Sequence, residues 1–228
     1  MKYLLTSGGV TTPTLRATLE ELLGTPIEQA SALCIPTAQW GHPACGPVSA
    51  RGFLTGAAPH ARMAGLGWRQ LGLLELTALP TIDPQRWQPW VRDADVLLVD
   101  GGEATYLRHH LEVSGLADFL PQLEDTVWVG VSAGSMALTP RIGTFFQDWP
   151  DAPDDRGLGV VSFSIFPHLD VFPTNTLEAA HRWHAEVGGQ AYVLDDASAV
   201  LVDGPRTAVV SDGVWHVLGA EDPADATL

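Results

Sequence analysis

Residues 125–138 read DTVWVGVSAGSMAL and place a serine between two glycines where an apolar run ends. The run TVWV is typical of a buried strand, and SMAL can continue as a short helix that Pro140 ends. Gly130, Ser132 and Gly134 match the pattern G-x-S-x-G, in which a nucleophile sits on a strained strand-to-helix turn and needs small neighbours. The stretch therefore predicts a nucleophilic serine. A chain with 23 glycines can also contain the pattern by chance, so a purely structural turn stays open.

The pattern around this turn predicts an α/β fold with a mostly parallel central sheet. Short apolar runs alternate with helical patterns through the first two thirds of the chain, which is typical of βαβ units. The expected strands are KYLLT (2–6), SALCIP (31–36), LGLLEL (71–76), DVLLVD (95–100) and TVWVGVS (126–132). The expected helices are TPTLRATLEELLG (12–24), with Pro near its start and Gly at its end, and EATYLRHHLEVSGL (103–116).

The chain changes character after the serine turn. Residues 145–159 are rich in Asp, Pro and Gly and predict an exposed loop, after which VVSFSIFPH (160–168) resumes as a strand. Turn signals then predict antiparallel hairpins among the short runs AYVL (191–194), SAVLV (198–202), TAVV (207–210) and VWHVL (214–218). We therefore expect one three-layer α/β/α domain over residues 1–220, followed by a frayed tail at 221–228.

Composition and charge disfavour several kinds of partner. The chain of 228 residues carries 27 acidic against 12 basic side chains, and its net charge of −15 would repel nucleic-acid phosphates and anionic lipid headgroups. No apolar run approaches the roughly 20 residues of a membrane span, so we expect a cytoplasmic protein. Cys34 and Cys45 suggest neither a disulfide framework nor a zinc site, and the loop-like context of Cys45 disfavours it as a nucleophile.

A serine nucleophile needs a general base that is itself oriented by a third group. Among the eight histidines, His168 in SIFPHLD is distinctive because it ends a strand, at the edge of the sheet where sites gather. His181 and His184 have the i, i+3 spacing of a metal pair. Because no third ligand is near them in the sequence, a solvated helix face is the better interpretation.

The acid that would orient His168 stays open on the residues alone. The chain order of α/β-hydrolases would place it between the serine and the histidine, on one of the loop aspartates Asp148, Asp151, Asp154 and Asp155. The alternative is Asp195 or Asp196 in YVLDDASAVLV, where a tight connection between two late strands could hold a carboxylate rigidly. An ordinary Asp-rich turn explains this pair equally well.

Four stretches together, in this order, resemble one known family. GVSAGSMAL, LLVDGGEATYL, FPH and VLDDASAVLV are similar to the peptidase E (aspartyl dipeptidase) and cyanophycinase family of serine peptidases, and to its fold, which is like that of class I glutamine amidotransferases. The resemblance implies Ser132 as nucleophile, His168 as base and Asp196 as the third member of a triad. It also implies an oxyanion hole made by the N–H group of Ala133 with that of Gly101 or Gly102.

The chain departs from the family pattern at positions that would bind the substrate. Glu103 stands where the family commonly has Asn or Asp. The aspartyl dipeptidases use an arginine on the helix after the catalytic histidine to bind the substrate aspartate, and this position falls on Leu177, with Arg182 five residues further on. Without a guanidinium facing the substrate carboxylate, specificity for an N-terminal Asp is in doubt.

We therefore expect a serine peptidase that hydrolyses small peptides by acyl transfer and needs no cofactor. The expected partner is a small peptide substrate, and a homodimer is compatible with the sequence. Three rival interpretations stay open: a cyanophycinase-like hydrolase with the same triad, an α/β-hydrolase esterase with a loop acid, and a binding domain that keeps the serine turn without turnover.

Overall fold

The computed structural model describes residues 1–57 and 63–219. Its strands are β1 (Lys2–Thr6), β2 (Ser31–Ile35), β3 (Gln70–Leu73), β4 (Val96–Val99), β5 (Val127–Val131), β6 (Ser164–Phe166), β7 (Ala191–Leu194), β8 (Ser198–Asp203), β9 (Arg206–Ser211) and β10 (Trp215–Leu218). Its α-helices are α1 (Pro13–Leu23), α2 (Pro47–Leu54), α3 (Pro84–Arg92), α4 (Ala104–Val113), α5 (Leu116–Phe119), α6 (Ala133–Met136) and α7 (Leu177–Val187). The predicted tail at 221–228 lies outside the described residues.

The central sheet has the strand order β3-β2-β4-β5-β1-β8-β9. The five strands from β3 to β1 run parallel, and β8 and β9 add an antiparallel hairpin beside β1. All four residues of β4 are fully buried, as expected for a parallel strand that is covered on both faces. The predicted α/β fold with a mostly parallel central sheet is therefore confirmed.

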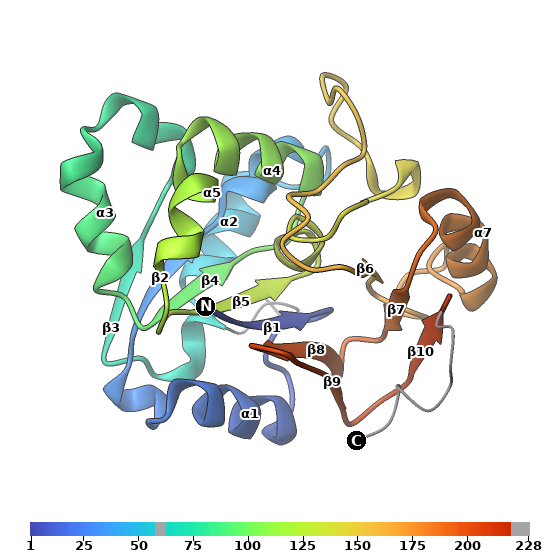
Figure 1. The fold of residues 1–228 in the computed structure, drawn as a ribbon, viewed down its shortest axis with the longest axis horizontal. Coiled ribbons are helices and arrows are strands. Elements are labelled where there is room, and N and C mark those ends of the chain that lie inside the picture. Colours follow the sequence, from blue (N-terminus) through green and yellow to red (C-terminus); the bar gives the residue numbers. More distant parts are fainter. Residues whose placement is uncertain (58–62, 220–228) are drawn as a thin grey trace.

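Helices cover both faces of this sheet (Figure 1). The side chains of β4 alternate between two apolar cores: Val96 and Leu98 pack with α1 and with Phe53 of α2, whereas Leu97 and Val99 pack with α3, α4 and α5. The helices on this sheet present apolar residues at helical spacing to one of the two cores, as Leu15, Leu19 and Leu22 of α1 do. The three layers are thus fixed by strands that are apolar on both faces.

A second sheet of three strands, in the order β10-β7-β6, follows the central sheet. In it β6 runs parallel to β7, and β10 runs antiparallel to β7. Trp183 of α7 is buried against Phe166 of β6, with ring centroids 5.5 Å apart. This sheet matters for the site because β6 leads directly into His168.

Several predicted elements differ in the structure. Only β8 and β9 form the expected hairpin, because the chain passes between the two sheets from β7 to β8 and again from β9 to β10. The strand predicted at 160–168 is confined to β6, and the one predicted at 71–76 gives way after β3 to a 3-10 helix at Leu76–Thr81. The early strands β1, β2, β4 and β5 match their predictions within one or two residues.

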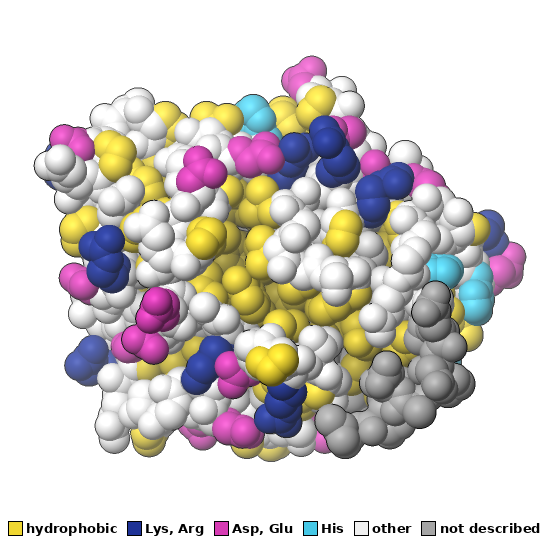
Figure 2. Space-filling view, in the orientation of Figure 1, with side chains coloured by type: hydrophobic (Ala, Val, Ile, Leu, Met, Phe, Trp, Pro, Cys, Tyr) yellow, Lys and Arg dark blue, Asp and Glu magenta, His cyan; other side chains and the backbone are white. Residues whose placement is uncertain are grey.

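Charged side chains tie the loop at 145–159 to its surroundings. Arg141 contacts Asp155 at 2.8 Å, and Arg108 of α4 contacts Asp154 at 3.0 Å. On the face shown in Figure 2, Lys and Arg side chains lie beside acidic ones and form no broad basic patch. In the part of the chain that the structure describes, every helix is too short or too polar to cross a membrane.

The turn between β5 and α6 packs so closely against β4 that its two glycines have no room for a side chain. A Cβ atom added at Gly134 would lie 2.3 Å from the carbonyl oxygen of Val99. A Cβ atom added at Gly130 would lie 2.5 Å from the carbonyl carbon of Gly134. Helix α6 therefore begins in direct contact with the ends of two parallel strands, which is where the serine of the turn stands.

We expect Gly134→Ala to lower the free energy of unfolding by about 1–3 kcal/mol, because the added methyl group overpacks a backbone contact that cannot give way. The matched control is Gly46→Ala, at a site of extended backbone with nothing within 4 Å of the added atom, which should change stability by less than about 1 kcal/mol. Urea denaturation of the two variants measures both values. Equal losses would contradict this packing argument.

Candidate active site

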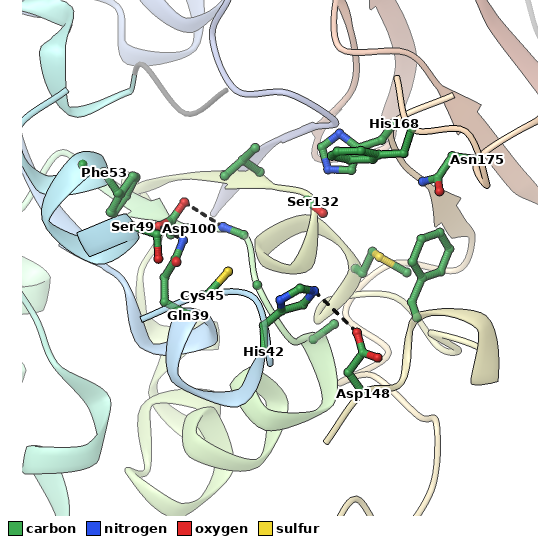
Figure 3. A pocket seen from close by; sticks show the side chains of 18 of the residues that line it. Gln39, His42, Cys45, Ser49, Phe53, Asp100, Ser132, Asp148, His168 and Asn175 are labelled. Atoms are coloured by element: carbon green, nitrogen blue, oxygen red, sulfur yellow. Dashed lines mark hydrogen bonds and ion pairs between the residues drawn. The ribbon is translucent and has the colours of Figure 1, made fainter. Parts of the chain in front are cut away.

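The carboxyl ends of the parallel strands meet at one edge of the central sheet, where α/β proteins bind ligands. Ser7 follows β1, Asp100 follows β4 and Ser132 follows β5. A cavity of about 1050 Å³ opens at this edge, and Asp100, Ser132 and His168 are among the residues that line it (Figure 3). This cavity is therefore the candidate active site.

Ser132 occupies a backbone conformation that side-chain-bearing residues rarely adopt. Its φ of 50° and ψ of −111° lie outside the usual regions, and such strain persists only where surrounding contacts hold it. Its N–H group donates to the carbonyl oxygen of Thr6 at 3.1 Å, and its own carbonyl oxygen accepts from Ser135 and Met136, both at 2.9 Å. These hydrogen bonds hold the serine at the N-terminal end of α6, as the G-x-S-x-G pattern predicts.

His168 also has a positive φ, of 60°, and is bonded through both its backbone and its ring. Its N–H group donates to the Ser7 hydroxyl at 2.7 Å, and its Nδ1 atom lies 2.7 Å from Oδ1 of Asp196. The Ser7 hydroxyl in turn donates to the same Asp196 oxygen at 2.9 Å. With Nδ1–H donated to a carboxylate, a neutral imidazole keeps Nε2 as a proton acceptor.

Asp196, and not Asp195, contacts the histidine. Asp195 instead holds the turn after β7, where its Oδ1 accepts from the Ser198 hydroxyl at 2.6 Å and from the Ala197 N–H at 3.1 Å. Asp196 can approach because Gly8 has no side chain: a Cβ atom there would lie 2.6 Å from the Cβ of Asp196. The short side chain of Asp196 can thus reach His168 because the backbone at Gly8, just after β1, packs directly against it.

Three of the four loop aspartates have other partners. Asp154 and Asp155 bind arginines, as described above, and Asp148 lies 3.5 Å from Nε2 of His42. Among the described residues, none of these three loop aspartates contacts His168. The geometry therefore favours the order serine, histidine, acid over the order of the α/β-hydrolases.

The backbone N–H groups predicted to form an oxyanion hole lie on the turn after β4 and at the start of α6. A Cβ atom at Gly101 would lie 3.4 Å from the Cβ of Ser132, so the glycine turn after β4 runs beside the serine. The Gly101 N–H already donates to Oδ1 of Asp100 at 2.8 Å. Within the described ranges, the N–H groups of Gly102 and Ala133 have no hydrogen-bond partner. Of the predicted oxyanion-hole groups, the N–H groups of Gly102 and Ala133 are therefore the two that remain free to donate to an oxyanion.

Asp100 is a buried carboxylate in the wall of the cavity. It is 2% exposed, and its Oδ2 accepts from the Gln39 side-chain amide at 2.6 Å. Burial raises the pKa of Asp100 to about 7, although its bonds from Gly101 and Gln39 act in the opposite direction. A raised pKa on a carboxyl group that lines a cavity is typical of functional sites.

The structure does not bring the three predicted substrate-binding residues to the cavity. Glu103 is fully buried as the cap of α4, where it accepts from the Thr105 hydroxyl at 2.8 Å and from the Tyr106 N–H. Leu177 is the first residue of α7, and Arg182 pairs with Glu178 on the exposed surface of that helix. Among the described residues, no lysine or arginine lines the cavity.

Nothing in the described part of the chain gathers three or more His, Cys, Asp or Glu side chains around a metal position. His184 binds the carbonyl oxygen of Gly189 at 2.8 Å instead. Cys45 lines the cavity, but burial raises the pKa of its thiol, which disfavours the nucleophilic thiolate.

Sequence reasoning missed Ser7, Gln39 and Asp100 as members of the site. All three follow the carboxyl end of a parallel strand, and this position was the available signal. Their roles could not be read from the sequence because each depends on a partner at least 60 residues away along the chain.

A covered parallel sheet, a strained serine turn and a histidine that line one cavity, with the histidine bonded to an aspartate, are typical of serine hydrolases. Residues 3–210 match the model of peptidase family S51, and the chain belongs to this family of serine-type peptidases. No curated protein matches the chain.

Two solved structures share the fold. A candidate peptidase E protein from Listeria monocytogenes EGD-e has 17% sequence identity and a TM-score of 0.70, over 93% of this chain and 98% of that one. A peptidase from an acI-B1 Actinobacterium has 19% identity and a TM-score of 0.69, over 97% of this chain and 95% of that one. At these identities the likeness supports the fold, which agrees with the peptidase E fold predicted from the sequence.

We expect Asp100→Asn to be more stable than the wild type at pH 8, and this advantage to shrink by about 2 kcal/mol at pH 5. With a pKa of about 7 in the folded protein, Asp100 binds a proton that the unfolded chain releases near pH 4, so its contribution to stability falls as the pH rises through this window. Urea denaturation of both proteins at the two pH values measures the difference. Parallel pH profiles would contradict the raised pKa.

Proposed function

We propose that this protein is a serine peptidase of peptidase E type that hydrolyses short peptides through Ser132, His168 and Asp196. The observation that carries the proposal is the 2.7 Å contact between His168 and Asp196, with His168 and the strained Ser132 lining one cavity. A base oriented by an acid is what a serine nucleophile requires. Membership of peptidase family S51 supports the same reaction.

In the proposed mechanism, Nε2 of His168 removes the proton from the Ser132 hydroxyl while the oxygen attacks the scissile carbonyl carbon. The tetrahedral oxyanion is stabilised by hydrogen bonds from the N–H groups of Ala133 and Gly102. Because the backbone fixes these donors in advance, they need not reorient when the negative charge develops. His168 then donates its proton to the leaving amine. Water, activated by the same histidine, hydrolyses the acyl-enzyme and restores Ser132.

The cavity supports a short peptide as the substrate. Its volume of about 1050 Å³ is at the upper end of ordinary ligand sites, which accommodates a few residues. Its walls include the aromatic rings of Phe145, Phe146 and Phe172, and Phe172 packs on His168 with ring centroids 5.2 Å apart. Because no lysine or arginine lines its described part, strict specificity for an N-terminal aspartate is disfavoured.

We expect Asp196→Asn to lower kcat/KM for short peptides by about 10³–10⁴-fold with little change in KM, because the histidine loses the acceptor that orients its ring. The matched control is Asp148→Asn, which removes a carboxylate that lines the cavity and should change kcat/KM by less than about 3-fold. Steady-state kinetics on a panel of unblocked dipeptides and tripeptides measures both effects.

The reverse outcome would identify an esterase-type triad. If Asp148→Asn abolished turnover while Asp196→Asn spared it, the loop acid would be the third member and the proposed triad would be wrong. Faster turnover of simple esters than of any peptide would likewise favour the α/β-hydrolase alternative.

A further inference from the structure

Two aromatic side chains in the wall of the cavity are exposed to a large extent. Phe145 is 43% exposed and Phe172 is 46% exposed, and both line the cavity. A single exposed apolar residue is ordinary, but aromatic rings that line a concave site are typical of contacts with a ligand. The proposed acyl-transfer steps make no use of either ring.

Phe172 is held in a fixed position beside His168. The two rings meet edge to face, with centroids 5.2 Å apart and an interplanar angle of 74°. Backbone hydrogen bonds tie the chain around them: the Val171 N–H donates to the carbonyl oxygen of His168 at 3.1 Å, and the Asn175 N–H donates to that of Phe172 at 2.9 Å. A ligand that packs on this ring therefore meets a surface that is already ordered.

Phe145 packs on the strand that leads into His168. Its ring centroid lies 5.5 Å from that of Phe166, the last residue of β6. The short 3-10 helix that carries Phe145 is held to α7 by Glu186, whose carboxylate accepts from the Thr144 N–H at 2.8 Å and from the Thr144 hydroxyl at 2.9 Å. The smaller sheet and α7 thus support this ring in the cavity wall.

The proposed reaction assigns this part of the wall to the leaving half of the substrate. His168 must reach the leaving nitrogen in order to protonate it, so the residue that carries this nitrogen lies on the side of His168. The side chain of that residue starts two bonds from the nitrogen, close to the ring of Phe172. In Figure 3, Asp100 and Phe53 lie on the opposite side of Ser132, where the acyl half belongs.

The charged side chains of the cavity disfavour an acidic leaving residue. Asp100 and Asp148 both line the cavity, whereas no lysine or arginine does so in the described part of the chain. Asp148 lies 3.5 Å from Nε2 of His42. A further carboxylate in this space would be repelled, but an apolar side chain would leave water for the surface of the two rings.

We propose that Phe145 and Phe172 form an apolar subsite for the side chain of the first leaving residue. The preferred substrates are short peptides with a large apolar residue directly after the scissile bond. Packing on the two rings removes apolar surface from water and holds the leaving nitrogen within reach of His168. This inference names the substrate class of the proposed peptidase and rests on that function.

The test uses four dipeptides that differ only in the second side chain: alanyl-phenylalanine, alanyl-alanine, alanyl-aspartate and alanyl-lysine. Steady-state kinetics gives kcat/KM for each dipeptide. Isothermal titration gives the affinity of each for the Ser132→Ala protein, which cannot form an acyl-enzyme. Both measurements are repeated with Phe145→Ala, Phe172→Ala and Phe172→Leu.

The matched control is Val171→Ala. Val171 is 38% exposed and belongs to the same loop as Phe172, but it is not among the described residues that line the cavity. The control therefore shortens an exposed apolar side chain next to the subsite without changing the subsite itself.

We expect alanyl-phenylalanine to be favoured over alanyl-alanine by about 10–100-fold in kcat/KM, as the burial of one large apolar side chain predicts. The affinities for Ser132→Ala should rank in the same order, with alanyl-aspartate the weakest. Phe145→Ala and Phe172→Ala should each lower the preference by at least about 3-fold. Phe172→Leu should retain most of it, and Val171→Ala should leave it unchanged.

The preference also separates a subsite from a purely structural role. If Phe172 only positioned the ring of His168, Phe172→Ala would slow all four dipeptides by the same factor and leave their affinities for Ser132→Ala unchanged, which would overturn the subsite. Equal use of all four dipeptides, a preference for the aspartyl or lysyl one, or no binding of any would overturn it as well.

Failure of the peptidase function is a distinguishable result. It would appear as no turnover of any dipeptide by the protein that retains Ser132. The titrations with Ser132→Ala would still show whether the two rings select an apolar side chain.

Discussion

The contact between the serine turn and the ends of the parallel strands is the constraint on which the site depends. Ser132 is held at a φ of 50°, a conformation that costs on the order of 1–3 kcal/mol. It persists because Thr6 of β1 accepts its N–H and because Gly130 and Gly134 let α6 approach β4 and β5. The strain leaves the serine at the wall of the cavity, with the N–H of Ala133 directly after it.

The second half of the site comes from the smaller sheet. His168 follows strand β6, and Asp196 lies in the connection from β7 to β8. The contact between the two side chains therefore links the smaller sheet to the central sheet. Ser7, at the end of β1, binds both residues and links them to the strand that also holds Ser132. The three side chains of the proposed triad are thus positioned by one set of backbone and hydroxyl contacts around β1.

Local sequence patterns predicted the parts of this structure that are locally determined. The strands β1, β2, β4 and β5 are apolar on both faces, and the turn at Ser132 needs its glycines, so both could be identified from the residues. The smaller sheet could not, because AYVL and WHVL carry no signal for which strand they pair with. The choice between Asp195 and Asp196 could not be made from the sequence, because it depends on the close approach of Gly8 to Asp196 in the folded chain.

The sequence likewise predicted Glu103 as a site residue, but its side chain is fully buried as a helix cap.

The most direct test of the account is where a mechanism-based probe reacts. A fluorophosphonate should label the wild-type protein once, and peptide mapping by tandem mass spectrometry should find the adduct on Ser132. Labelling should be lost in Ser132→Ala and become much slower in His168→Ala. An adduct on another serine, or a folded wild-type protein that does not react, would contradict the account.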